Sequence, residues 1–125
     1  MKNRSLADRV GFAVAGWRAA WAREHSFRTQ ASIAAVALLV LIVLRPPPIW
    51  WAIVAVTCAL VLALELINSA LEALVDLLHP SIHPEIKFIK DVLAGAVLAI
   101  STAALIVAVA LVVASAPNLL AMFGG

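Results

Sequence analysis

The segment from Val92 to Ala116 limits the possible folds of this chain more than any other feature, because its 25 residues include no charged side chain. A helix of about 20 mostly apolar residues is long enough to cross the hydrocarbon core of a bilayer. Inside that core the backbone N–H and C=O groups find no water, and a helix satisfies them internally. The sequence therefore predicts a transmembrane helix, which we place at residues 90–116.

Two shorter uncharged runs precede this segment. Ala31–Leu44 ends at the sequence Arg45-Pro-Pro-Pro48, where proline lacks a backbone donor and terminates a helix. Ile49–Leu64 follows and continues into a longer helical pattern. Hydrophobic residues make up 65% of the chain and charged residues 13%, against about 45–50% and about 25% in soluble domains. We expect a single-domain, all-α membrane protein (residues 1–125) with membrane helices at residues 29–44, 49–76 and 90–116.

Residues 1–28 are polar and basic. Their Lys and Arg residues are Lys2, Arg4, Arg9, Arg18, Arg23 and Arg28, against the acids Asp8 and Glu24. Apolar residues at helical spacing are Leu6, Val10, Phe12, Val14, Trp17 and Trp21. This pattern predicts an amphipathic surface helix over residues 1–28, with its arginines at lipid headgroups. A helix packed on the rest of the protein would show the same pattern, and both arrangements can hold together.

The distribution of Lys and Arg predicts the orientation of the three spans. Six of these residues lie in 1–28 and two in the connection 77–90, whereas the turn between the first two spans carries only Arg45. The positive residues are expected on the inner side. We therefore expect a cytoplasmic N-terminus and an outside C-terminus.

Four polar residues follow the second apolar run at spacings of three, four and four. They are Glu65, Asn68, Glu72 and Asp76. On a helix they fall within an arc of about 80°. Acids at membrane depth are costly and usually functional, and two carboxylates seven residues apart can bracket a phosphate-bound Mg²⁺. A solvated helix end accounts equally well for Asp76, and a polar contact between helices is an alternative for Asn68.

Lys90 and Asp91 stand at the entry to the third span, at the same membrane depth as Glu72. A lysine in this place is either a cytoplasmic anchor or a phosphate-binding group. The sequence contains neither Gly-x-x-x-x-Gly-Lys nor Gly-x-Gly-x-x-Gly, which excludes a soluble-type nucleotide fold.

These polar residues are part of a long sequence motif. It runs Glu65-Leu-Ile-Asn-Ser-Ala-Leu-Glu-Ala-Leu-Val-Asp76, followed by Ile89-Lys-Asp91 and Ala94-Gly-Ala-Val97, and preceded by Phe12-Ala-Val-Ala-Gly16, Arg18-Ala-Ala-Trp21 and Glu24-x-x-Phe27-Arg28. Over about residues 10–115 the chain resembles the prokaryotic diacylglycerol kinase / undecaprenol kinase family. The resemblance implies a homotrimer with active sites shared between subunits, located in the bacterial inner membrane. It also implies transfer of the γ-phosphoryl group of ATP, with Mg²⁺, to the hydroxyl of a membrane lipid.

The resemblance assigns roles to individual residues. It implies that Glu65 is the general base on the lipid hydroxyl, with Asn68 beside it in the catalytic set. Glu24 and Glu72 match the carboxylates that hold Mg²⁺. The residues assigned to the nucleotide are Lys90, Asp91, Asp76, Phe12 and Arg18. These roles suit phosphoryl transfer, which depends on positioning and charge neutralisation.

Two lipid acceptors remain open: diacylglycerol, giving phosphatidic acid, and undecaprenol, giving undecaprenyl phosphate. Arg28-Thr-Gln30 stands where Gram-negative diacylglycerol kinases carry Arg-Gln-Glu, and Phe12-Ala-x-x-Gly16 looks more like the undecaprenol kinases. Arg18-Ala-Ala-Trp21, in contrast, looks Gram-negative. An alternative function of another class is a non-catalytic assembly subunit, or an ion or proton conduit that uses the intramembrane acids. Conduits commonly place acids in mid-bilayer, whereas here they gather near one interface.

Overall fold

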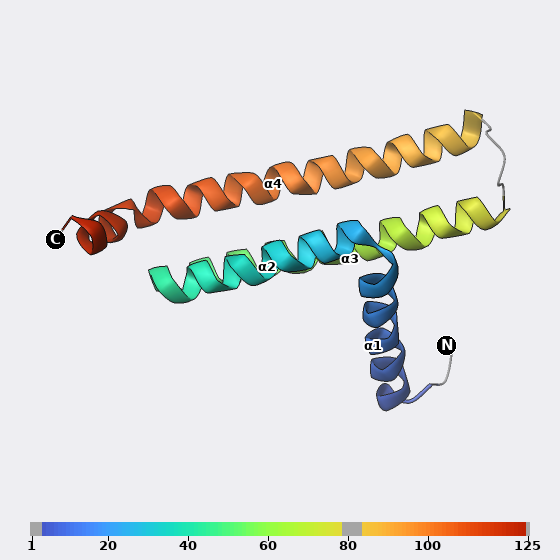
Figure 1. Cartoon of the computed structure of the whole chain (residues 1–125), viewed down its shortest axis with the longest axis horizontal. Helices are drawn as coiled ribbons and strands as arrows, with labels where there is room; N and C mark the ends of the chain where they lie inside the picture. Colours follow the sequence, from blue (N-terminus) through green and yellow to red (C-terminus); the bar gives the residue numbers. More distant parts are fainter. Residues whose placement is uncertain (1–3, 79–83, 125) are drawn as a thin grey trace.

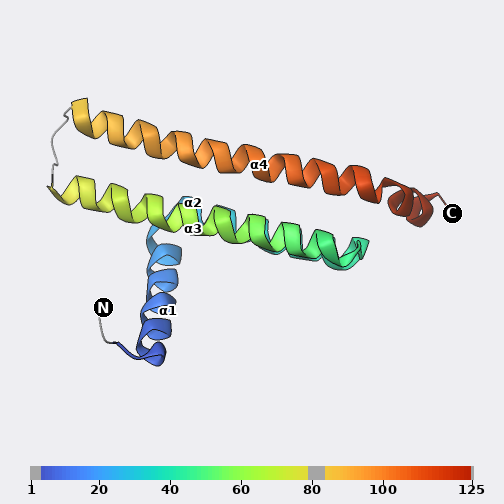
Figure 2. The same ribbon diagram turned by 180° about the vertical axis from the view of Figure 1, so that it is seen from behind.

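The computed structural model describes residues 4–78 and 84–124, which form four helices and no strand. The helices are α1 (Leu6–Arg23), α2 (His25–Leu44), α3 (Pro48–Leu78) and α4 (Pro84–Phe123). Figure 1 shows α2, α3 and α4 extended along the long axis of the molecule, with α1 crosswise to them. The same arrangement is seen from behind in Figure 2. The predicted all-α fold is confirmed.

Three of these helices, α2, α3 and α4, are long and apolar enough to cross a membrane. Helix α3 packs against both α4 and α2, so it is the central element of the described chain. Most large apolar side chains of the single chain point outward; Leu98, Leu105 and Ile106 of α4 are examples. Three spans with an apolar exterior agree with the prediction of a membrane protein.

The buried apolar contacts concentrate at one end of the bundle, beside the turn between α2 and α3. Leu41 and Leu44 of α2 cluster with Val54 of α3 and Leu111 of α4. The partly buried residues packed around this cluster include Trp50, Trp51 and Cys58. The acids of α3 lie toward the other end of that helix, so apolar packing and polar chemistry are separated along the bundle.

The observed helices extend beyond the segments predicted from apolar runs. Helix α1 ends at Arg23 and α2 begins at His25, so residues 25–28 belong to the second helix and not to the predicted surface helix. The break falls at Glu24, whose extended backbone (φ −113°, ψ 107°) belongs to neither helix. An uncharged run indicates which residues lie in the membrane. The helix itself can continue beyond that run, because it ends only where the backbone dihedrals change.

Helix α4 differs most from its predicted range, 90–116. It begins at Pro84, where proline needs no donor, and continues through Pro117 to Phe123. Pro117 cannot bond the carbonyl of Val113 and is expected to bend the helix. The last part of α4, drawn in red, does turn away from the axis of the rest (Figure 1). The residues from Pro117 to Phe123, which lie beyond the predicted range, therefore form a bent helical end.

The turn after α2 depends on one strained residue. Arg45 has φ 48° and ψ 54°, the left-handed region, and its N–H donates to the carbonyl of Leu41 at 2.9 Å. A residue with a Cβ is penalised there by about 1–2 kcal/mol, and glycine is not.

We expect Arg45→Gly to stabilise the protein by about 1 kcal/mol, because it removes this strain. Arg45→Val should destabilise it, since a β-branched side chain worsens the same strain. Unfolding in mixed micelles, followed by circular dichroism, measures both. A glycine variant less stable than the wild type would contradict this account of the turn.

Candidate active site

Helix α3 presents its four polar residues along one face with graded burial. Glu65 is 4% exposed, Asn68 and Glu72 are half-buried, and Asp76 is exposed near the helix end. The helix is unbroken from Pro48 to Leu78, so the spacing predicted from the sequence applies. Glu65 and Glu72 are then about 10 Å apart along the axis, at about 1.5 Å per residue. The face leads from a buried carboxyl group to an exposed one.

Two groups on this face lack a protein partner within the described chain. The Oδ1 atom of Asn68 is buried and accepts no hydrogen bond. The carboxyl group of Glu65 has no hydrogen bond to any described residue. Buried polar groups are normally paired, and an exception indicates a functional role or an unseen ligand. Asn68 and Glu65 are therefore available to a bound molecule.

Lys90 of α4 meets the exposed end of this face. Its Nζ donates to Oδ1 of Asp76 at 2.9 Å, across the α3–α4 contact. Glu72 adds a weaker, longer-range attraction on the same ammonium group. The ion pair thus brings together two of the predicted site residues, which the sequence places 14 positions apart.

Asp91, predicted to lie beside Lys90 in the nucleotide site, has a different partner. It accepts from Nζ of Lys87 at 2.6 Å, one turn earlier on α4. Both side chains of this pair are well exposed. Two lysine–aspartate pairs therefore stand side by side at this end of α4, one within the helix and one between helices.

Glu24 lies at the joint between α1 and α2, and it lines a groove against α3. The groove has a volume of about 490 Å³. Its α1 wall includes Gly16, Trp17 and Ala20, and its α3 wall includes Ser69 and Ala73, which flank Glu72 in sequence. The Glu24 carboxylate thus borders a groove whose α3 wall lies beside, and not on, the helix face that carries Glu65 and Glu72.

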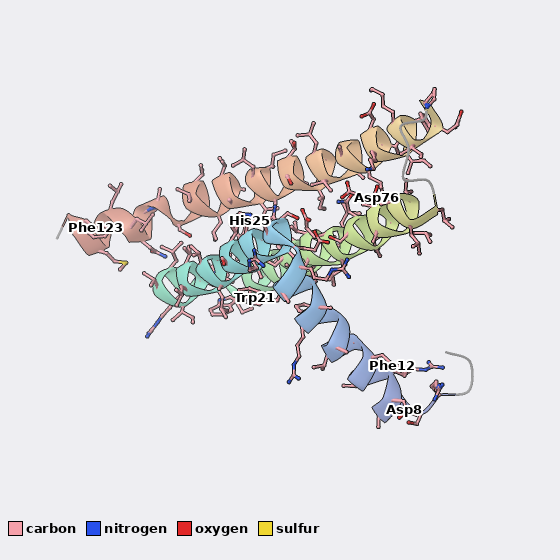
Figure 3. The ribbon with its side chains drawn as sticks, turned by 45° about the vertical axis from the view of Figure 1, so that its right-hand side comes forward. Asp8, Phe12, Trp21, His25, Asp76 and Phe123 are labelled. Carbon is pink, nitrogen blue, oxygen red and sulfur yellow. The ribbon has the colours of Figure 1, made fainter. Side chains whose placement is uncertain are left out.

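Phe12 and Arg18, also assigned to the nucleotide, lie on α1 in different surroundings. Phe12 is half-exposed, with the guanidinium group of Arg4 5.9 Å from its ring centroid. In Figure 3 Phe12 lies at the far end of α1, well away from Asp76. Arg18 is exposed. The single chain does not bring Phe12 to the acids of α3.

Metal-binding chemistry within one chain is limited. Residues 4–78 and 84–124 contain no cluster of three or more His, Cys, Asp or Glu side chains. Mg²⁺ held by one or two carboxylates, with phosphate and water as the other ligands, needs no such cluster. Carboxylate oxygens are the ligand type that Mg²⁺ prefers, so Glu24 and Glu72 fit a phosphate-bound ion.

Sequence reasoning missed several contacts of this region. The Asp76–Lys90 pair, the Lys87–Asp91 pair and the place of Ser69 in the groove were not predicted. The i, i+4 spacing of Lys87 and Asp91 is a signal that sequence reasoning can use. A pairing between helices, by contrast, leaves no trace in local spacing.

These features define a class: a helical membrane protein whose polar chemistry lies at the edge of the apolar bundle. The chain belongs to the prokaryotic diacylglycerol kinase family, whose sequence pattern matches residues 11–112. It is 39% identical over 97 residues to a protein of Synechocystis sp. named diacylglycerol kinase, covering 77% of this chain and 55% of the relative. It is 32% identical over 81 residues to a diacylglycerol kinase of Helicobacter pylori J99, covering 65% and 63%. The matched part thus spans between about half and two thirds of these relatives' lengths.

Proposed function

We propose that this protein is a lipid kinase that transfers the γ-phosphoryl group of ATP to the hydroxyl of a membrane lipid. The observation that carries the proposal is the 2.9 Å ion pair between Lys90 and Asp76. It puts a lysine at the exposed end of the same helix face on which Glu65 is buried. A proton acceptor at lipid depth and a cation nearer water are what a lipid hydroxyl and a polyphosphate require. Membership of the prokaryotic diacylglycerol kinase family supports the same activity.

The chemistry starts at Glu65. Its carboxylate accepts the proton of the lipid hydroxyl as the hydroxyl oxygen attacks the γ-phosphorus, the bond to the β-phosphate oxygen breaks, and ADP leaves. Glu65 makes no hydrogen bond to a described residue, so its oxygens are free to accept. Asn68 lies one turn further along, and its Oδ1 has no partner. Because the single hydroxyl proton goes to Glu65, Asn68 would orient the hydroxyl by donating from its Nδ2 to the hydroxyl oxygen.

Lys90 binds the phosphate charge in this proposal, and Asp76 holds the ammonium group in place. A fixed cation aimed at developing negative charge stabilises the transition state. Glu24 and Glu72 would hold Mg²⁺ through their carboxylate oxygens. When bound, Mg²⁺ supplies neutralisation of phosphate charge. Asp91, Phe12 and Arg18 complete the proposed nucleotide set.

The placement of these residues favours a shared site. Phe12 and Asp76, both assigned to the nucleotide, lie far apart in one chain (Figure 3). We propose that a homotrimer completes each site, and that the N-terminus faces the cytoplasm of a bacterial inner membrane, where ATP is available. In this arrangement α1 lies along the membrane surface.

The acceptor is tested directly by competition. Purified protein in mixed micelles receives γ-labelled ATP, Mg²⁺, and equal amounts of diacylglycerol and undecaprenol. We expect labelled phosphatidic acid, undecaprenyl phosphate or both, with none when Mg²⁺ is removed. The ratio of the two products identifies the preferred acceptor.

An absence of labelled lipid from either acceptor would contradict the proposal. Ion flux through vesicles carrying the protein would then favour the conduit that the intramembrane acids also allow. A flux assay on the same preparation therefore separates the two functions.

A further inference from the structure

The joint between α1 and α2 consists of a single residue, Glu24. Its N–H donates to the carbonyl of Ala20 at 2.8 Å, and its own carbonyl accepts from the N–H of Arg28 at 3.2 Å. The backbone of Glu24 thus closes the last turn of α1 and opens the first turn of α2. Any change in the angle between these helices moves the Glu24 carboxylate.

One side chain bridges this joint. The last carbonyls of a helix have no partner within the helix. At the end of α1, the carbonyl of Ala20 accepts from the N–H of Glu24. Nη1 of Arg28, one turn into α2, donates to the carbonyl of Trp21 at 2.6 Å and lies 3.4 Å from that of Ala22. The guanidinium charge also suits the negative end of the α1 dipole. Arg28 therefore ties the end of α1 to the body of α2.

Apolar packing also stabilises the joint, next to the hydrogen bonds of Arg28. Phe27, the neighbour of Arg28, is 2% exposed. Its ring meets that of Trp17 edge to face, with the centroids 5.6 Å apart. Such packing resists separation of the helices, but it does not fix the direction of the α1 carbonyls. The two hydrogen bonds from Arg28 supply that direction.

The direction of α1 matters because α1 has little direct packing with α3. Its main contact is with α2, at this joint. The groove between α1 and α3, which Glu24 lines, is therefore shaped largely by the angle at Glu24. A group that fixes this angle also fixes the distance from Glu24 to helix α3, across the groove.

We propose that Arg28 is a positioning residue for the metal site, which it serves by holding Glu24 toward α3 without touching metal or substrate. The proposal rests on the proposed function, in which Glu24 and Glu72 hold Mg²⁺. Loss of a group that orients a metal ligand typically weakens metal affinity by about 10–100-fold. The loss should appear in the Mg²⁺ dependence more than in the rate at saturating Mg²⁺.

The first measurement is kinetic. We expect Arg28→Met to raise the apparent KM for Mg²⁺ at least about tenfold, with a much smaller change in kcat at saturating Mg²⁺. Arg28→Lys keeps the charge but loses the planar fork, and its KM for Mg²⁺ should fall between those of the wild type and the methionine variant. The matched control is Arg45→Met, at the other end of α2, which should leave both constants at the wild-type values.

The second measurement does not depend on activity. Spin labels at Ala13→Cys and Ala73→Cys, in a Cys58→Ala background, report the width of the groove that both positions line. Labelled chains are diluted with unlabelled ones, so that each distance is measured within one chain. Arg28→Met should shift or broaden the distance distribution, Arg28→Lys should do so less, and Arg45→Met should not.

Two results would overturn the proposal, and a third would overturn the metal assignment on which it rests. Wild-type distances in the Arg28 variants would overturn it, because the joint would hold without the tie. A changed distance with an unchanged KM for Mg²⁺ would also overturn it, leaving Arg28 a helix cap only. If Glu24→Gln leaves the Mg²⁺ dependence unchanged, the metal assignment of the proposed function fails, and the label distance alone then decides whether Arg28 sets the joint.

Discussion

Replacing Glu65 by glutamine is expected to lower lipid phosphorylation by a factor of about 10²–10⁴, the usual contribution of a general base. Glutamine keeps the size of the side chain and cannot accept the hydroxyl proton. Glu65 is 4% exposed, so water does not readily take the place of its carboxylate as the base. Single-turnover transfer of labelled phosphate to lipid measures the chemical step separately from binding.

A matched control is Asp8→Asn, which makes the same carboxyl-to-amide change on the exposed first turn of α1. It should leave turnover close to that of the wild type. Retention of near wild-type turnover by Glu65→Gln would show that another group takes the proton. Helical content and micelle size of both variants show whether either one is misfolded.

Lys90→Gln is expected to reduce activity by about 10²–10³-fold, the usual effect of removing a group that stabilises transition-state charge. The variant also leaves Asp76 without its partner at 2.9 Å. Binding of a non-hydrolysable ATP analogue should weaken in parallel, and this binding is measured without lipid.

Lys87→Gln is the contrasting variant on the same helix. Lys87 pairs with Asp91 within α4, and both side chains are exposed. Exposed pairs of this kind contribute little, so the loss of activity should stay below about fivefold. Equal losses in the two variants would mean that Lys90 has no special role and that net positive charge alone matters.

The three spans could be predicted because apolar content is a local property of the sequence. The ends of the helices could not be predicted from it. Glu24 breaks a helix although glutamate is a good helix former, and Pro117 stays within one although proline normally ends it. Neither outcome follows from the helix propensity of the residue itself.

The candidate site also has features that the sequence predicts and others that it does not. The common face of Glu65 and Asp76 follows from spacing, since both residues lie on one unbroken helix. The partner of Lys90 depends on the packing of α4 against α3, and the sequence showed only that the acids and the lysine share a depth. Arg28 donates to a carbonyl seven residues earlier. This contact crosses the helix break at Glu24, so the spacing within a continuous helix does not predict it.

The outward-facing apolar side chains have a consequence for how stability must be studied. Between helices immersed in hydrocarbon, the hydrophobic effect supplies no attraction, and packing and hydrogen bonds remain. In water the same surfaces, for example Leu105 and Ile106, would drive association without order. The stability of this protein therefore depends on the detergent or lipid around it. Unfolding has to be measured as a function of the chain length and mole fraction of that amphiphile, as it is measured against urea concentration for a soluble enzyme.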